Sequence, residues 1–153
     1  MSNLPLLALE IDIIPLVSRV LHILSAVILV GGLFYIRTIL SPAGVDACFA
    51  DRRAVWAKWV GITTAFLLLT GIYNLILIIG EAKADGVKLP PTYHMLFGVK
   101  FLLGLIVMFI AAILAGKTEA ADRFRGQMRK WLNIGWLAAV AIIVIAAVLR
   151  SLH

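Results

Sequence analysis

The chain has 153 residues, of which 63% are hydrophobic and only 14% are charged. A soluble domain of this length leaves much of its area exposed and cannot hide so large an apolar fraction, so the composition excludes that class. The single cysteine, Cys48, excludes an internal disulfide and a thiolate metal cluster within one chain. We attribute the net charge of +6 to loops that set orientation in a membrane, and expect no nucleic-acid partner.

Four runs of nearly uncharged residues are each long enough to cross a lipid bilayer. They are Ile14–Leu40, Ala54–Gly80, Thr92–Gly116 and Trp131–Leu149. Short connections make successive helices antiparallel neighbours. The sequence therefore predicts an all-α integral membrane protein, an up-down bundle of four transmembrane helices that forms one domain over residues 1–153.

Several residues indicate where these helices begin and end. Pro15 suits the first turn of the first helix, and Gly80 is expected to close the second. Thr92 is predicted to cap the third helix. After Gly116, the stretch "KTEAADRFRGQMRK" predicts a short amphipathic helix before the fourth span, with Thr118 as its cap.

The basic residues predict an orientation in the cell (inner) membrane. The first and third loops with their flanks carry nine: Arg37, Arg52, Arg53, Lys58, Lys117, Arg123, Arg125, Arg129 and Lys130. The opposite side carries four: Arg19, Lys83, Lys88 and Arg150. By the positive-inside rule, loops one and three are cytoplasmic and both termini lie outside.

Two ionisable residues lie deep in the spans. His22 and Lys100 are each eight residues into parallel spans, which places both about 12 Å below the outer boundary. A charged side chain at such depth costs roughly 2.5–3.5 kcal/mol, so Lys100 either pairs with an anion or becomes a neutral amine. We expect the two residues to face a common pocket.

Other polar residues fall near this level. Arg19 and Ser25 share the helical face of His22, and Tyr73 comes from the outer end of the second span. His94 and Met95 lie at the mouth of the third span. The four spans contain no acidic residue, and no nucleotide loop, zinc signature or serine triad is present.

Three segments of the chain are similar to a known family. "LHILSAVILVGGLFYIRTIL" resembles the first conserved helix of the HemJ-type membrane protoporphyrinogen IX oxidases, with His22 and Arg37 in place. "GVKFLLGLIVMF" resembles their lysine-bearing helix at Lys100, and "RKWLNIGWLAAVAIIVIAAVLR" resembles their last helix at Arg129 and Asn133. The similarity extends to the membrane domain of the copper-resistance protein CopD.

The resemblance implies a b-type haem in the bundle, with His22 as an axial ligand and Lys100 at the porphyrin or the iron. It also implies oxidoreductase activity with Lys100 and Arg37 as catalytic residues. Haem contacts would come from Arg19, Ser25, Tyr73 and Asn133. The partners would be a tetrapyrrole, an electron acceptor and, in a homo-oligomer, further copies of the chain.

Two alternatives stay open. A CopD-like protein would bind or transport copper, with His22, His94, Met95 and Met108 as sparse ligands, since Cu(I) favours sulfur and imidazole. A non-catalytic subunit of a membrane complex would need none of these roles.

Overall fold

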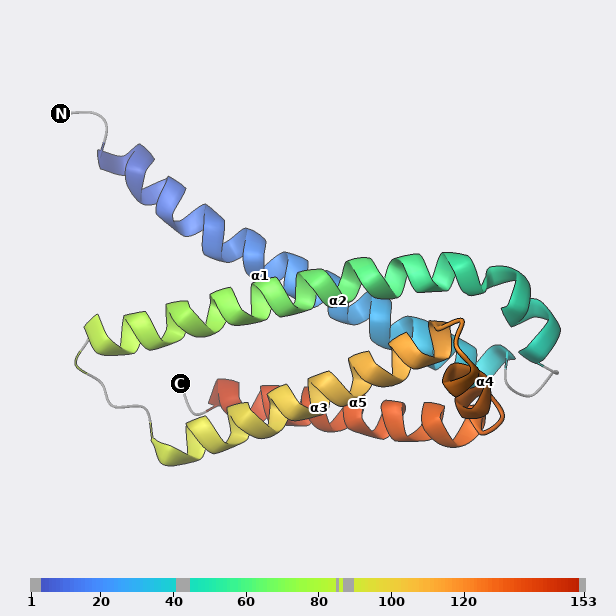
Figure 1. The fold of residues 1–153 in the computed structure, drawn as a ribbon. Helices are drawn as coiled ribbons and strands as arrows, with labels where there is room; N and C mark the ends of the chain where they lie inside the picture. The colour runs from blue at the N-terminus through green and yellow to red at the C-terminus, as the bar shows by residue number, and fades with distance from the viewer. Residues whose placement is uncertain (1–3, 41–44, 85, 87–89, 152–153) are drawn as a thin grey trace.

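A computed structural model describes the backbone of residues 4–40, 45–84, 86 and 90–151, and the side chains of residues 13–39, 52–84, 86 and 90–150. The elements, in chain order, are α1 (Leu4–Tyr35), a π-helical turn η1 (Ile36–Leu40), α2 (Val45–Ala84), α3 (Pro91–Ala115), α4 (Glu119–Arg125) and α5 (Met128–Ser151). The predicted all-α class is confirmed, and the described ranges contain no strand (Figure 1).

Four of the helices are long and apolar enough to cross a membrane. These segments are Ile13–Ile39, Arg52–Ala84, Pro91–Ala115 and Met128–Arg150. They coincide with the four spans predicted from the sequence to within a few residues at each end. In lipid, a helix satisfies its own backbone hydrogen bonds, which is why such apolar runs form helices. The chain is a multi-pass helical membrane protein.

The four long helices form a ring in which sequence neighbours pack antiparallel. α1 packs along α2 and α3 along α5, while α2 contacts α3 and α1 contacts α5. α1 and α3 therefore lie diagonally across the bundle. α1 crosses the bundle obliquely, so that its first turns stand away from the other helices (Figure 1).

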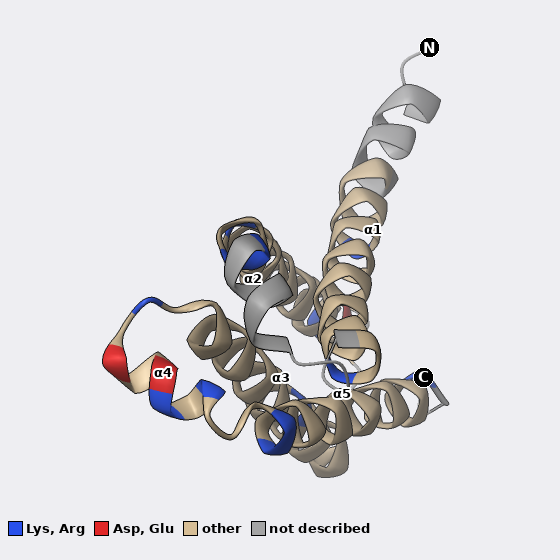
Figure 2. Ribbon diagram, turned by 90° about the vertical axis from the view of Figure 1, so that its right-hand side faces the viewer, with Lys and Arg blue, Asp and Glu red and all other residues tan. Residues whose placement is uncertain are grey.

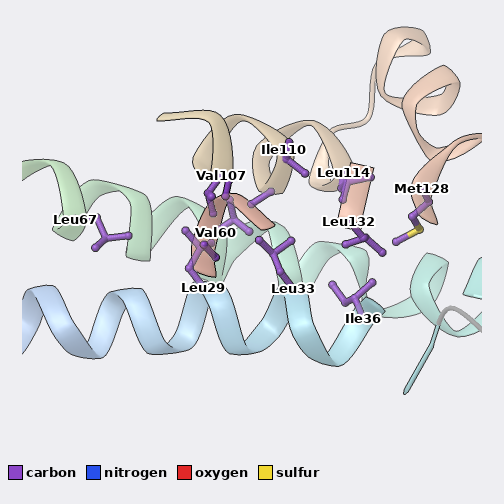
Figure 3. Packing of buried hydrophobic residues seen from close by; sticks show 13 residues of the cluster. Leu29, Leu33, Ile36, Val60, Leu67, Val107, Ile110, Leu114, Met128 and Leu132 are labelled. Carbon is purple, nitrogen blue, oxygen red and sulfur yellow. The ribbon is translucent and has the colours of Figure 1, made fainter. Parts of the chain in front are cut away.

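The two ends of the bundle differ in packing. We name them the α4 end, where η1, α4 and the start of α5 meet, and the Pro91 end, where α3 begins. The hydrophobic core belongs to the α4 end, as Figure 3 shows, with the side chains pointing toward one another between the helices. Its buried members are Leu29, Leu33, Ile36, Val60, Leu67, Val107, Ile110, Ala111, Leu114, Met128, Leu132, Ala138 and Ala139.

Buried polar residues follow on from this core toward the Pro91 end. Ser18, Ser25 and Thr70 are all less than 9% exposed, at 8%, 5% and 7%. The apolar residues around them on α1 are largely exposed; Ile23 and Val27, for example, are 61% and 62% exposed and face the surroundings of the bundle. The interior of the Pro91 end is thus a polar stripe between helices rather than an apolar core.

α4 closes the end of α3. The Thr118 hydroxyl accepts a hydrogen bond from the backbone N–H of Ala121 at 3.2 Å, so the predicted cap is confirmed. The Arg125 guanidinium donates to the carbonyls of Gly116 (2.7 Å) and Leu114 (3.3 Å) and pairs with Asp122. These bonds satisfy carbonyls that the end of α3 leaves without helical partners.

Three predicted boundary residues are wrong. α1 begins at Leu4, so Pro15 lies inside the helix, where membrane helices tolerate proline. α2 runs past Gly80 to Ala84, because one glycine does not break a helix that packing and lipid already favour. α3 begins at Pro91 after Pro90, and no side chain caps it. Thr92 lies within its first turn and is no cap.

Candidate functional site

Two polar pairs join α1 to α2 near the Pro91 end. The Ser18 hydroxyl donates to Asn74 Oδ1 at 3.0 Å, and His22 Nδ1 lies 2.9 Å from Thr70 Oγ1. In each helix the two residues are four apart and therefore share a face. Because the helices are antiparallel, Ser18 meets Asn74 one turn from the place where His22 meets Thr70. Both pairs are satisfied within the interface instead of facing lipid.

The direction of the His22 bond follows from the protons available. The Thr70 hydroxyl carries one proton, which it donates to the backbone carbonyl of Phe66, one turn earlier in α2. With that proton used, the Thr70 oxygen is left as an acceptor facing Nδ1 of the ring. The Leu67 carbonyl, on the same face of α2, also lies near the ring. A neutral imidazole has one N–H, so Nε2 holds an unshared electron pair.

Gly71 makes room for the imidazole. A Cβ atom at this position would lie 3.3 Å from His22 Cε1 and 3.8 Å from Nδ1, tighter than ordinary van der Waals contact at the first of these. The ring therefore lies directly against the α2 backbone. α2 supplies both the acceptor for the ring and the space in which the ring sits.

Lys100 lies on α3, diagonally across the bundle from α1. Its side chain is half-buried, and its ammonium group is close enough to act electrostatically on the His22 imidazole. Among the side chains that the structure describes, no carboxylate forms an ion pair with Lys100. The two nitrogen-bearing side chains that the sequence singled out are thus both half-buried and within range of an electrostatic interaction. In the described part of the chain, the lysine has no internal counter-ion.

The remaining residues predicted near His22 differ in burial. Ser25 is buried one turn further along the face of His22, and Tyr73 is half-buried on α2 next to Asn74. Arg19 is exposed, one residue beyond Ser18. Ser25 and Tyr73 therefore belong to the interior of the Pro91 end, while Arg19 lies at its surface.

Arg37 and Asn133 form a separate pair at the α4 end. The Nε–H of Arg37, in the π-helical turn η1, donates to Asn133 Oδ1 on α5 at 2.7 Å. Arg37 follows His22 by fifteen residues, so the two are about 22 Å apart along the helix axis. The structure joins the two residues that the resemblance placed at the porphyrin, but it does not bring either of them to His22.

The additional copper ligands considered in the sequence do not gather around His22. His94 is exposed, and Met95 is 63% exposed on the first turns of α3. Among the described residues, no three histidine, cysteine or acidic side chains cluster as a metal site. In the described part of the chain, His22 is therefore not a member of a multi-histidine cluster.

Reasoning from the sequence missed Thr70, Gly71 and the Phe66 carbonyl. A pattern in α2 could have revealed the first of these. Positions spaced alternately by four and three residues form one stripe along α2: Trp56, Val60, Thr63, Leu67, Thr70 and Asn74. Residues at such spacing lie on the face of a helix that packs against a neighbouring helix. The two polar residues at the end of this stripe are the partners of His22 and Ser18.

The fold and the polar interior together define a class: a four-span helical membrane protein with an interior histidine and lysine at one end of the bundle. Comparisons with family models, with curated proteins and with solved structures find no match to this chain.

Proposed function

We propose that this chain is a haem-binding membrane redox protein that holds a b-type haem at the Pro91 end of the bundle. The observation that carries the proposal is the hydrogen bond between His22 Nδ1 and Thr70 Oγ1, which engages one ring nitrogen of His22 and leaves Nε2 to face a ligand. Histidines that bind metals donate their other ring N–H to a partner in the same way. A neutral imidazole is a common axial ligand of haem iron.

Lys100 fits the same ligand in either of two ways. As an ammonium group it would pair with a haem propionate, which supplies the counter-ion that the described side chains do not. As a neutral amine, it would be a second nitrogen ligand for the haem iron, supplied by α3 across the bundle from His22. Both uses need a nitrogen-bearing side chain near the imidazole in the interior, and the half-burial of Lys100 and its electrostatic influence on His22 support this.

The proposed activity is that of an oxidoreductase of the protoporphyrinogen-oxidase kind, which the chain resembles at His22, Lys100 and Arg37. When bound, the haem supplies one-electron chemistry, and the protein supplies binding and orientation. His22 would hold the cofactor, and Lys100 would hold carboxylates of the cofactor or of a porphyrinogen. Arg37, fixed by Asn133 at the α4 end, would receive a carboxylate or an acceptor at that face.

The orientation proposed here puts the α4 end in the cytoplasm and the Pro91 end outside, in the cell (inner) membrane. The excess of lysine and arginine at the α4 end supports it, and Figure 2, which views this end, shows basic residues on α4 and at the start of α5. The haem would then lie in the outer half of the membrane.

An absorption spectrum tests the haem. Protein purified from haem-supplied cells is expected to show a Soret band, and His22→Ala is expected to lose it because the axial nitrogen is removed. The matched control is His94→Ala, which removes an exposed imidazole and should leave the band unchanged. Wild-type protein without a Soret band would refute haem binding, and an unchanged band in His22→Ala would refute the ligand assignment.

A further inference from the structure

The geometry assigns Thr70 a role as the positioning residue that fixes the tautomer of His22 and so presents Nε2, rather than Nδ1, as the free ring nitrogen. The assignment of this tautomer concerns the protein alone. Its consequence for a ligand rests on the proposed haem site, so the two parts have separate tests.

The first step is to ask which groups carry the protons in the hydrogen bonds that link His22, Thr70 and the Phe66 carbonyl. A backbone carbonyl only accepts, so the short bond between Thr70 Oγ1 and the Phe66 carbonyl uses the hydroxyl proton. Thr70 is 7% exposed and is held in place by the packing of α1 on α2. The hydroxyl therefore presents only a lone pair to the ring, and the N–H must be on Nδ1. A serine hydroxyl can do the same, and a valine side chain of the same shape cannot.

The second step is the position of the ring against α2. Gly71 follows Thr70, and its missing Cβ is what lets His22 Cε1 approach the α2 backbone. The edge of the ring that bears Nδ1 is thereby held against α2. A ring held in this way, with one fixed N–H, is pre-organised for a ligand at its other nitrogen, which lowers the entropy lost on binding.

The chain contains a matched control for Thr70. Thr63 lies two turns earlier on the same stripe of α2, is 2% exposed, and likewise donates to carbonyls of its own helix, those of Trp59 (2.8 Å) and Val60 (3.3 Å). No hydrogen bond to histidine is described for Thr63. Replacing either threonine with valine removes a buried hydroxyl of the same kind, and only the change at Thr70 removes the partner of the ring.

Nuclear magnetic resonance of the cofactor-free protein tests the tautomer. In protein labelled with ¹⁵N-histidine and kept alkaline so that the rings are neutral, the missing signals of a His22→Gln sample identify those of His22. We expect a protonated Nδ1 and an unprotonated Nε2 in the wild type and in Thr63→Val, and both tautomers in Thr70→Val. A wild-type His22 protonated at Nε2 would overturn the inference, whether or not the protein binds haem.

Haem titration tests the consequence. Loss of a hydrogen-bond partner behind a metal-binding histidine typically weakens binding about 10–100-fold. We expect this loss, with a shifted Soret maximum, in Thr70→Val, near-normal binding in Thr70→Ser, and no change in Thr63→Val. If Thr70→Val does not fold, Gly71→Ala replaces it. The added Cβ would lie 3.3 Å from His22 Cε1, so the ring must shift by a few tenths of an ångström, and we expect this shift to weaken binding.

The failures are distinguishable. A protein that takes up no haem in any variant refutes the proposed function, and the nuclear magnetic resonance result still decides the tautomer. A protein that binds haem equally well with valine at Thr70 and at Thr63 refutes the positioning role and leaves the haem site standing.

Discussion

At the scale of single residues, the least ordinary feature is Lys100, which lies in the interior without an ion-pair partner among the described side chains. A buried charge that lacks a partner lowers stability, and an apolar residue of similar volume is often neutral or stabilising in its place. A packing role alone therefore does not explain a lysine here. The proposed ligand, which brings its own carboxylate, would supply the missing partner.

The substitution Lys100→Met separates these two roles. We expect the cofactor-free variant to be as stable as the wild type or more stable, by up to about 3 kcal/mol, because the burial penalty is removed. Thermal unfolding in detergent measures this. The same variant is expected to lose bound pigment, measured as Soret absorbance per protein.

Lys58→Met is the control, since Lys58 is exposed on α2 at the opposite end of the bundle. It should change neither quantity. If Lys100→Met keeps its pigment in full, Lys100 has no part in holding the cofactor, and a non-catalytic role for this residue is favoured.

At the scale of helices, α1 and α2 meet most closely where Gly32 faces Trp56. A Cβ atom at Gly32 would lie 2.4 Å from Trp56 Cζ3 and 2.8 Å from Cη2. The indole fills the space that the missing side chain leaves, next to the core residues Leu29, Leu33 and Val60. This contact sets the distance between the two helices near the α4 end, and the polar pairs set their alignment near the Pro91 end.

The neighbouring glycines of α1 give a paired prediction. Gly32→Ala overpacks the contact with Trp56 and is expected to destabilise the protein by about 1–3 kcal/mol. Gly31 has nothing within 4 Å of a built Cβ, so Gly31→Ala should be neutral or stabilise the helix by up to about 1 kcal/mol. Thermal unfolding of both variants in detergent gives the comparison. Equal melting temperatures would contradict the close contact.

The helices themselves could largely be predicted, because length and hydropathy decide which segments cross a membrane. The Thr118 cap was also predictable, since it depends on local sequence alone. The ends of the spans were not. Gly80 and Thr92 are weak local preferences, and packing and lipid override them.

The site could be predicted only in part. His22 and Lys100 were found because ionisable groups are rare in apolar spans, and the parallel direction of their helices put them at one level. Thr70 and Gly71 were missed because threonine and glycine are common in membrane helices. Their importance comes from the register of α1 on α2, which single-helix patterns do not contain.

At the scale of the whole molecule, the bundle combines a tightly packed apolar end with a polar, less closely packed one. The core at the α4 end holds the four helices together, and α4 closes it through Arg125. The first turns of α1 stand away from the other helices at the opposite end (Figure 1). Stability and the proposed chemistry are thus assigned to different halves of one domain.

The proposed orientation predicts which half faces which side. In a Cys48→Ser background, Glu81→Cys near the Pro91 end should react with a membrane-impermeant maleimide in intact cells. Lys117→Cys near the α4 end should react only after permeabilisation. Both original side chains are exposed, so access to the reagent depends on the side of the membrane. The reverse labelling pattern would invert the orientation.

The pairing of Ser18 with Asn74 and of His22 with Thr70 has one more consequence. If α1 slid along α2 by a single helical turn, Ser18 would reach Thr70, His22 would stand opposite Phe66, and the amide of Asn74 would meet only hydrocarbon. An apolar surface alone would permit several such placements at similar energy. The two polar contacts favour one register of α1 on α2 over the others. In the membrane interior, water is not present to satisfy the polar groups that another register would leave without a partner.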